Sequence, residues 1–289
     1  MLALVSSRAQ AVITITEIMY HPAGGGRDLE YIELHNETPD PMDLTGYFFR
    51  AGIDFTFTER TFLDPGAYIV VCANKEAIRA KYGIENVVGD WSPDTALDNG
   101  GEAVELANPG GLVESRVQYN DRGKWPSGAD GTGHSLELEY VYTNTDDPDR
   151  WALSGVLGGS PGKPNDTAIG AMPVFVNEAF LIGAERWVEI YNGGTEAVNL
   201  TGYHLTDDRA NLSRGTLPAV VLEPRAFITF TETALGLNLA PDGNGRTFIA
   251  LVSPGGDRVI DARLFRPEPG VSEARIPDGN AQFSSFADP

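Results

Sequence analysis

Apolar and polar residues alternate with a period of two along residues 30–36, which read Glu-Tyr-Ile-Glu-Leu-His-Asn. Ile32 and Leu34 fall on one face of an extended segment and Glu33 falls on the other, which is typical of a strand with one buried face. Residues 186–192 repeat the pattern as Arg-Trp-Val-Glu-Ile-Tyr-Asn, with Val188 and Ile190 on the apolar face. The pattern predicts two equivalent strands whose other face is turned outward.

Both strands are followed at the same spacing by Leu-Thr-Gly-Tyr, at 44–47 and at 200–203. Because strand, corner and next strand recur without an insertion, the pattern indicates one folding unit made twice. We therefore predict a leader or cropped signal-peptide tail at 1–11, a first β-sandwich at 12–166, and a second at 167–289. The second lacks a counterpart of the Pro-Gly-x-x-Asn phrase at 161–165, so it is expected to be short or cut.

Many short apolar stretches separated by Gly, Pro and Asn turns predict an all-β fold, with each half an immunoglobulin-like antiparallel β-sandwich. Pro65-Gly66 predicts a type II turn, whereas Arg225 at the equivalent place predicts a type I turn. One short helix is expected near 74–82, capped by Asn74 and closed by Gly83.

Composition narrows the function classes. The 289 residues carry 21 basic and 41 acidic side chains, a net charge of −20 that opposes binding to nucleic acid and to anionic lipid. No apolar run is long enough to span a membrane. The single cysteine, Cys72, lies in an apolar run and is expected to be a buried core residue. We expect a monomer that folds without a metal.

The candidate chemistry is sparse. Glu17, Glu33, Glu178 and Glu189 are the prominent carboxylates, but a glycosidase needs two that face one cleft at about 5 to 10 Å. Alternation turns Glu33 away from the core, so we expect it to bond loop backbone amides or an arginine. No catalytic set is apparent, and we predict that the protein is not an enzyme.

Metal and cofactor signals are equally sparse. The four histidines show no metal-ligand spacing; they are His21, His35, His134 and His204. Asp146, Asp147 and Asp149 form an oxygen-rich loop that is a candidate calcium site, although it lacks the glycine and distal glutamate of an EF-hand. No other cofactor is expected, and a solvated acidic loop is the alternative.

Four aromatic residues are the candidate binding residues, since such rings stack on sugars or on protein partners. Trp125 and Trp151 flank proline-rich turns, so an edge-covering core position is the alternative for both. Trp187 lies beside Tyr191 on the outward face of its strand and is the best candidate for an interdomain or partner contact.

These phrases recur in the same order in both halves of the chain. Together they resemble the lamin tail domain, an immunoglobulin-like sandwich of nuclear lamins and of secreted bacterial proteins. The resemblance rests on the paired phrases quoted above and on Thr16-Glu17, Asn177-Glu178, Leu63-Asp64-Pro65-Gly66, Asp98-Asn99-Gly100-Gly101-Glu102, Asp130-Gly131 and Ser160-Pro161-Gly162-Lys163-Pro164-Asn165. The first half looks like the bacterial subtype, while Arg225 and the lack of a final Pro-Gly-x-x-Asn depart from the pattern.

The resemblance implies a non-catalytic module that docks, spaces or anchors a secreted enzyme or surface protein. We therefore expect a binding, adhesion or spacer module of a bacterial protein that is extracellular, periplasmic or at the cell surface, with a protein or glycan partner. The alternative is a carbohydrate-binding module, assisted by calcium, that is attached to a secreted enzyme. Nucleic-acid binding by kinship with nuclear lamins is a third hypothesis, which the net charge opposes.

Overall fold

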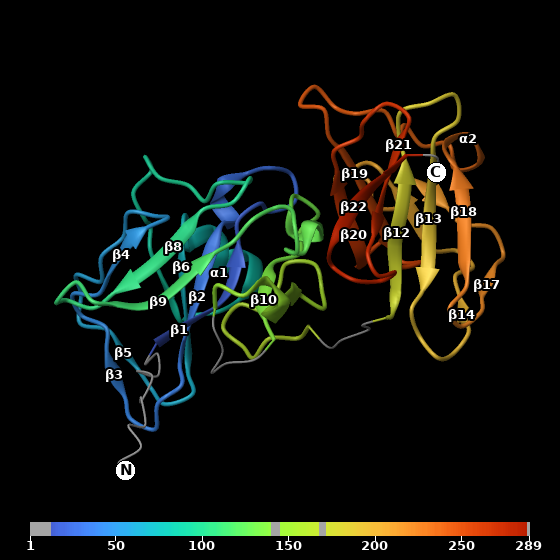
Figure 1. Cartoon of the computed structure of the whole chain (residues 1–289). Coiled ribbons are helices and arrows are strands. Elements are labelled where there is room, and N and C mark those ends of the chain that lie inside the picture. Colours follow the sequence, from blue (N-terminus) through green and yellow to red (C-terminus); the bar gives the residue numbers. More distant parts are fainter. Residues whose placement is uncertain (1–12, 140–144, 168–171, 288–289) are drawn as a thin grey trace, which may run out of the picture.

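The computed structural model describes residues 13–139, 145–167 and 172–287, and its strands form two β-sandwiches that lie side by side (Figure 1). The strands pair within residues 13–153 or within residues 174–287. We call these two bodies the first and the second sandwich. The predicted leader at 1–11 falls outside the described residues, and the predicted boundaries at 166 and 167 stay a prediction.

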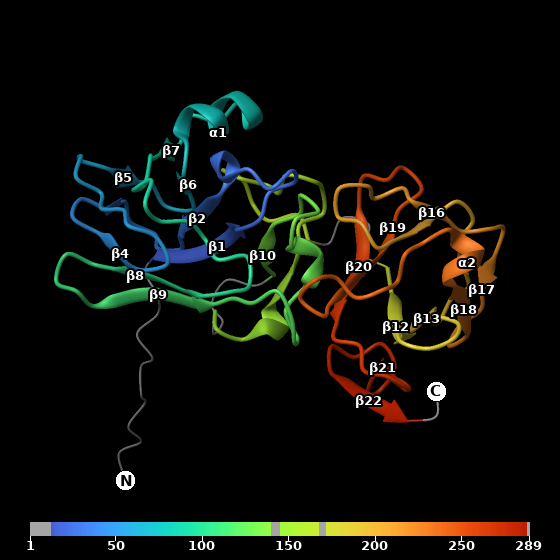
Figure 2. The same cartoon turned by 90° about the horizontal axis from the view of Figure 1, so that it is seen from above.

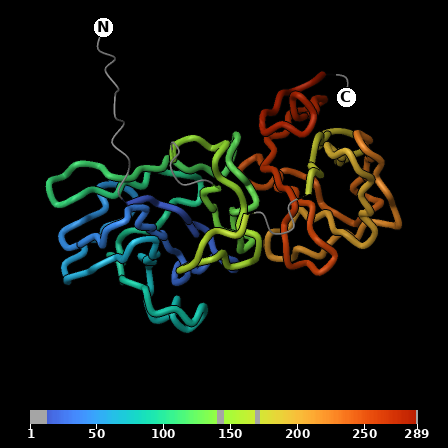
Figure 3. Tube along the Cα trace, turned by 90° about the horizontal axis from the view of Figure 1, so that it is seen from below, coloured from blue at the N-terminus to red at the C-terminus, as the bar shows by residue number. Residues whose placement is uncertain are grey.

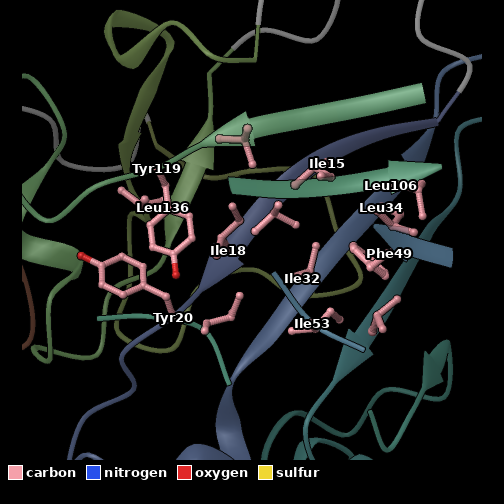
Figure 4. Packing of buried hydrophobic residues seen from close by; sticks show 14 of the residues in the cluster. Ile15, Ile18, Tyr20, Ile32, Leu34, Phe49, Ile53, Leu106, Tyr119 and Leu136 are labelled. Carbon is pink, nitrogen blue, oxygen red and sulfur yellow. The ribbon is translucent and has the colours of Figure 1, made fainter. Parts of the chain in front are cut away.

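The first sandwich packs a six-stranded sheet, in the order β11-β10-β1-β2-β6-β7, against a three-stranded sheet in the order β4-β8-β9. Side chains such as Ile15, Ile32 and Leu34 meet Phe49 and Leu106 between the two sheets (Figure 4). The strands of the larger sheet are β1 (Ile13–Met19), β2 (Tyr31–Asn36), β6 (Tyr68–Cys72), β7 (Val87–Val88), β10 (Leu136–Leu138) and β11 (Trp151–Leu153). The others are β4 (Phe48–Ala51), β8 (Ala103–Ala107), β9 (Val113–Gln118), and a separate pair, β3 (Met42–Asp43) and β5 (Phe62–Leu63).

The second sandwich packs a five-stranded sheet, in the order β18-β13-β12-β21-β22, against a four-stranded sheet in the order β16-β15-β19-β20. The first sheet contains β12 (Val174–Phe180), β13 (Trp187–Asn192), β18 (Phe227–Thr231), β21 (Val271–Arg275) and β22 (Phe283–Ala287). The second contains β15 (His204–Thr206), β16 (Gly215–Thr216), β19 (Thr247–Val252) and β20 (Val259–Phe265), while β14 (Val198–Asn199) pairs with β17 (Val221–Leu222).

The first hairpins of the two sandwiches have the same register. Glu17 pairs with Glu33 across β1 and β2, and Glu178 pairs with Glu189 across β12 and β13. A β-bulge precedes the first glutamate of each pair, between Ile15 and Glu17 and between Val176 and Glu178. The repeated sequence phrases therefore fold into the same local structure.

The expectation that β2 has one outward face is wrong. Ile32 and Leu34 lie in the core as predicted, but Tyr31 and Glu33 are also fully buried. The helix α1 (Lys75–Tyr82) lies on the side of β6 and β7 away from β4, β8 and β9 (Figure 2), and Ile78 of this helix packs in a cluster that contains Tyr31. Alternation along one strand cannot show that a later segment covers its polar face.

Helix α1 itself was predicted correctly. The Asn74 side chain accepts a hydrogen bond from the Ala77 amide at 3.0 Å, and Gly83 ends the helix in the left-handed region, at φ 66°. The structure adds a second, one-turn helix α2 (Glu232–Leu235), which follows β18. The described residues also contain the 3-10 segments η1 (Arg27–Leu29), η2 (Ser127–Ala129) and η3 (Pro148–Arg150).

The turn before β18 also differs from its prediction. Gly66 has φ 71°, as its predicted type II turn requires, but Arg225 has φ 60° instead of the negative value of a type I turn. The backbone N–H of Gly66 donates to the Asn36 carbonyl at 2.8 Å, and that of Arg225 donates to the Asn192 carbonyl at 2.9 Å. The surrounding backbone therefore imposes the same turn on an arginine.

The outer face of β19 and β20 joins the two sandwiches, which touch along one side (Figure 3). Leu153 of the first sandwich packs against an apolar cluster on this face that includes Phe248 and Val259. Around this cluster, Arg209 pairs with Asp130 at 2.5 Å and Arg246 pairs with Asp121 at 3.1 Å.

Candidate functional site

Three buried glutamates lie in a row on the larger sheet of the first sandwich. Glu17 on β1 is the register partner of Glu33 on β2 and of Glu137 on β10, and all three have no exposed surface. Partners in antiparallel strands point to the same face, so the three carboxyl groups are neighbours. Glu17 and Glu33 are among the carboxylates that the sequence makes prominent, whereas Glu137 is not, although the alternation Leu136-Glu137-Leu138 is a signal of a strand.

The carboxyl group of Glu17 is at the centre of a hydrogen-bond network. Its Oε1 accepts from the hydroxyl groups of Tyr31 and Ser135, both at 2.5 Å, and from the backbone N–H of Ser160 at 3.0 Å. Its Oε2 is buried without a hydrogen-bond partner. A full negative charge on this group would therefore be poorly solvated.

The other two glutamates also bind residues 158–166, which we call the covering segment. Glu33 Oε2 accepts from the backbone N–H of Gly162 at 2.6 Å, and Glu137 Oε2 accepts from that of Asp166 at 2.8 Å. Thr16 donates to Glu33 Oε1 at 2.8 Å, and the Ser160 hydroxyl donates to Glu137 Oε1 at 2.7 Å. This confirms the prediction that Glu33 binds loop backbone amides.

Burial raises the pKa values of all three glutamates. For Glu17, desolvation is the main cause of a pKa well above the ordinary value, and the charges of Glu33 and Glu137 add to it. Desolvation raises the pKa of Glu33 to about 8 and that of Glu137 to about 7. At neutral pH the cluster therefore holds protons that the same side chains would release in water.

The covering segment is fixed on the sheet at both ends. The carbonyl of Gly158 accepts hydrogen bonds from Tyr31 at 3.0 Å and from Tyr82 of α1 at 2.9 Å. Asn165 donates from Nδ2 to the carbonyls of Thr16 at 2.9 Å and Leu138 at 2.8 Å. The Ser-Pro-Gly-Lys-Pro-Asn phrase at 160–165 is thus an integral cover of the first sandwich.

This arrangement suits a scaffold better than a catalyst. A glycosidase keeps its two carboxyl groups on either side of an open cleft. Here the glutamates have no exposed surface, and hydroxyl and backbone N–H groups of the protein already occupy their oxygens.

The second sandwich contains the same pair of acids, and no segment of its described residues covers them as residues 158–166 cover the first pair. Glu178 accepts from the Ser272 hydroxyl at 2.5 Å, as Glu17 does from Ser135, and Glu189 accepts from Asn177 at 3.1 Å. Ala274 takes the place of Glu137, since it is the register partner of Glu178. A hollow of about 450 Å³ opens at Glu178. Its other lining residues are Ala274, Arg275, Ile276, Pro277, Asp278 and Phe286.

A cavity of about 330 Å³ lies between the two sandwiches. Trp125 and Trp151 line it from the first sandwich, and Phe175 and Phe283 line it from the second. Four cationic side chains and two acids also line it, namely Lys124, Arg258, Arg263, Arg275, Glu139 and Asp261. The lining is therefore aromatic and carries more positive than negative groups, in a protein of net charge −20.

Two of these arginines retain unused donors. The Nε atoms of Arg258 and Arg263 are buried and have no hydrogen-bond partner. Arg263 donates from Nη1 to the Gly123 carbonyl at 2.7 Å, and its guanidinium lies 3.9 Å from the centre of the Phe283 ring. Arg258 donates to the Gly155 carbonyl at 2.7 Å. Both arginines line the cavity, and Arg263 also pairs with Glu273 at 3.0 Å.

The predicted binding residues are not gathered in one place. Trp125 and Trp151 are buried in the core of the first sandwich, with ring centres 5.9 Å apart, so the alternative core position is the observed one, although both still line the cavity. Trp187 is half-buried on β13 and stacks on Phe180. Tyr191 is buried beneath Phe227.

The candidate calcium ligands are engaged with basic groups or backbone amides. Asp146 pairs with Arg116 and accepts from the Gln118 amide, and Asp149 pairs with Lys124 at 2.6 Å. Asp147 caps the η3 segment. In the part of the chain that the structure describes, no group of three or more His, Cys, Asp or Glu side chains is arranged to hold a metal ion.

Cys72 and His134 are both buried within the protein. Cys72 lies in an apolar cluster as predicted, and desolvation raises the pKa of its thiol to about 12. His134 lies between Ser154 of the first sandwich and Val259 of the second. Its Nδ1 is 2.9 Å from the Ser154 carbonyl, and its Nε2 accepts from the backbone N–H of Val259 at 3.0 Å. None of the helices among the described residues is long and apolar enough to cross a membrane.

Fold and geometry together define an immunoglobulin-like, all-β module. The family model described as Lamin Tail Domain matches residues 6–121, a segment that includes β1 to β9 and two of the three buried glutamates. This match supports the lamin tail domain family for that part of the chain. A search of curated proteins finds no match.

Proposed function

We propose that this chain is a non-catalytic binding or spacer module of an exported or cell-surface bacterial protein. The observation that carries the proposal is the covering segment, whose backbone N–H groups bind the buried row of Glu17, Glu33 and Glu137 and so help to hold the first sandwich together. The exported location is supported by the resemblance to secreted bacterial domains.

We propose further that residues 167–289 form a second lamin-tail-like unit. What supports this is the shared register and bulge of the two first hairpins, together with the shared turns at Gly66 and Arg225. Two units joined by ion pairs and an apolar patch would present a rigid double module, which suits a role in docking or spacing.

A turnover screen tests the non-catalytic function. The full chain and the variants Glu17→Gln, Glu33→Gln and Glu137→Gln are assayed on esters, phosphates, nucleic acids and glycans. We expect no rate above that of the heat-denatured chain. A rate that one of these substitutions abolishes, while the variant remains folded by circular dichroism, would show that the cluster is an active site.

Carbohydrate binding is the second candidate, and the cavity between the sandwiches favours it. Its Trp125 and Trp151 rings and the unpaired Nε–H groups of Arg258 and Arg263 suit a sugar that bears a carboxylate. A glycan array with neutral and acidic sugars, run with and without calcium, tests it. We expect binding of acidic sugars that weakens in Arg258→Gln, whereas no binding to any glycan removes this candidate.

A further inference from the structure

Among the described residues, the polar face of the second sandwich has no counterpart of the segment that covers this face in the first sandwich. The turn at Asp278 and Gly279 contacts it beside the acids, through two hydrogen bonds with Asn177. Glu178, Phe180, Trp187 and Glu189 lie on one side of β12 and β13, because cross-strand partners share a face. Figure 1 shows β12, β13 and β18 at the front of the second sandwich with no helix across them. On neighbouring strands, Phe227 is 45% exposed and Phe286 is 39% exposed.

The glutamates of the two polar faces have equivalent side-chain hydrogen-bond donors within their own sandwiches. Ser135 donates to Glu17 and Ser272 donates to Glu178, both at 2.5 Å. In the same way, the bulge residue Thr16 donates to Glu33 at 2.8 Å, and the bulge residue Asn177 donates to Glu189 at 3.1 Å.

The faces differ in what lies on top. In the first sandwich the backbone N–H groups of Ser160 and Gly162 donate to Glu17 and Glu33 at 3.0 and 2.6 Å. In the described part of the second sandwich, Ser272 is the hydrogen-bond donor to Glu178 and Asn177 is the donor to Glu189, and the hollow of about 450 Å³ opens beside Glu178. Within residues 172–287, the donors that the covering segment supplies to Glu17 and Glu33 have no counterpart at Glu178 and Glu189.

We infer that this face binds a peptide segment of a partner protein that carries a Ser-Pro-Gly turn like that of the covering segment. The backbone N–H groups of the turn would donate to Glu178 and Glu189, as those of Ser160 and Gly162 do to Glu17 and Glu33. Its flanking apolar residues would cover Phe286 and Trp187. The inference rests on the proposed binding function and names the chemical class of the partner.

Two further observations favour a glycine-containing turn over an arbitrary peptide. Gly159 and Gly162 have φ +78° and +80°, a conformation that other residues adopt at a cost. A Cβ at Gly159 would overlap the Glu17 carboxyl group, so close approach of backbone to the acid requires glycine there. The charge also fits, since carboxylates accept charge-assisted hydrogen bonds from backbone N–H groups.

The test uses the full chain and a fluorescently labelled peptide with the sequence of residues 155–167, and it follows binding by anisotropy. We expect saturable binding that weakens about tenfold or more in the double variant Glu178→Gln/Glu189→Gln. The matched control is Glu185→Gln, which removes an exposed acid between β12 and β13 and should bind as the unaltered chain does. A second peptide carries N-methylglycine at the Gly162 position, which removes one donor, and it should bind more weakly.

Three outcomes would overturn the inference. The first is no binding of the peptide, and the second is equal binding to the chain and to the double variant. The third is a concentration-dependent dimer in sedimentation that the double variant loses, which would assign this face to a second copy of the chain. None of them affects the turnover screen, so the proposed non-catalytic function stands or falls separately.

Discussion

Gly159 passes directly over the carboxyl group of Glu17, where a side chain has no room. A Cβ at this position would overlap Glu17 Oε1, the Tyr31 hydroxyl and Ser135 Oγ, and the backbone is in the left-handed region at φ +78°. We expect Gly159→Ala to lower the free energy of unfolding by about 2 to 4 kcal/mol, measured by urea denaturation. Gly24→Ala is the control, because Gly24 has φ +84° but open space around it, and should cost only about 1 kcal/mol. Equal losses would mean that the close approach to Glu17 is unimportant.

The protons on the buried glutamates make stability depend on pH. The pKa of Glu137 is about 7 in the folded protein against an ordinary 4.5, so the folded state holds this proton more tightly than the unfolded state. Its contribution is therefore complete below about pH 4.5 and is lost as pH rises through 7. It amounts to a few kcal/mol, on the order of 1.4 kcal/mol for each pKa unit.

Glu137→Gln tests this dependence, since an amide keeps the shape but cannot ionise. We expect the unaltered chain to lose stability in denaturant titrations between about pH 5 and pH 9, and the variant to lose clearly less. Glu59→Gln, at an exposed position, should follow the unaltered chain. Parallel curves for Glu137→Gln and the unaltered chain would contradict the raised pKa.

At the scale of elements, local sequence was enough wherever neighbouring residues decide the structure. Helix α1 forms because Asn74 and Gly83 cap it, and the strands β2 and β13 follow the alternation of Ile32, Leu34, Val188 and Ile190. The burial of Glu33 could not be predicted in this way. Its cover is a segment about 130 residues further along the chain, at Gly162, and no local period reports such a contact.

In the turn between β17 and β18, contacts with distant residues determine the backbone conformation against the preference of the local sequence. Arg225 is held at φ 60° by a backbone hydrogen bond to Asn192, although a side chain is strained there. We expect Arg225→Gly to raise the free energy of unfolding of the second sandwich by about 0.5 to 1 kcal/mol. Thermal and urea unfolding measure this change. The converse variant, Gly66→Ala in the first sandwich, should lower the free energy of unfolding by a similar amount. If Arg225→Gly destabilises the protein instead, the contacts of the arginine side chain contribute more than the backbone strain costs.

At the scale of the whole molecule, the contact between the sandwiches brings together residues that carry no shared signal in the sequence. Asp130 and Arg209 are far apart in the chain, and so are Asp121 and Arg246, yet each pair meets across the interface. Trp187 is the best candidate for an interdomain or partner contact from the sequence, because it is an aromatic residue on the outward face of its strand. The contact instead uses apolar side chains on the outer face of β19 and β20, such as Phe248 and Val259.

We predict that His134 makes the contact between the two sandwiches sensitive to acid. Its Nε2 accepts from the Val259 N–H, so Nδ1 carries the single proton of a neutral ring and donates to the Ser154 carbonyl. A second proton on Nε2 would face a donor at 3.0 Å. Burial lowers the pKa of this ring to about 4, and the charge of nearby Arg258 acts in the same direction, while Asp166 and Asp257 oppose it.

A histidine with a lowered pKa binds fewer protons when folded than when unfolded, so its contribution is complete above about pH 6.5 and is lost as pH falls toward 4. The loss is at most about 3 kcal/mol.

We expect the two sandwiches to unfold in two separate stages near pH 4, which calorimetry measures. We also expect the radius of gyration in X-ray scattering to increase as the sandwiches separate. His134→Gln should weaken this dependence, because its side-chain carbonyl can still accept from Val259 and does not titrate. His204→Gln removes an imidazole from within the second sandwich and serves as the control. Of these two histidines, His134 is the one whose ring accepts a hydrogen bond from Val259 across the contact. If His134→Gln and His204→Gln respond to acid alike, the acid response does not arise from His134.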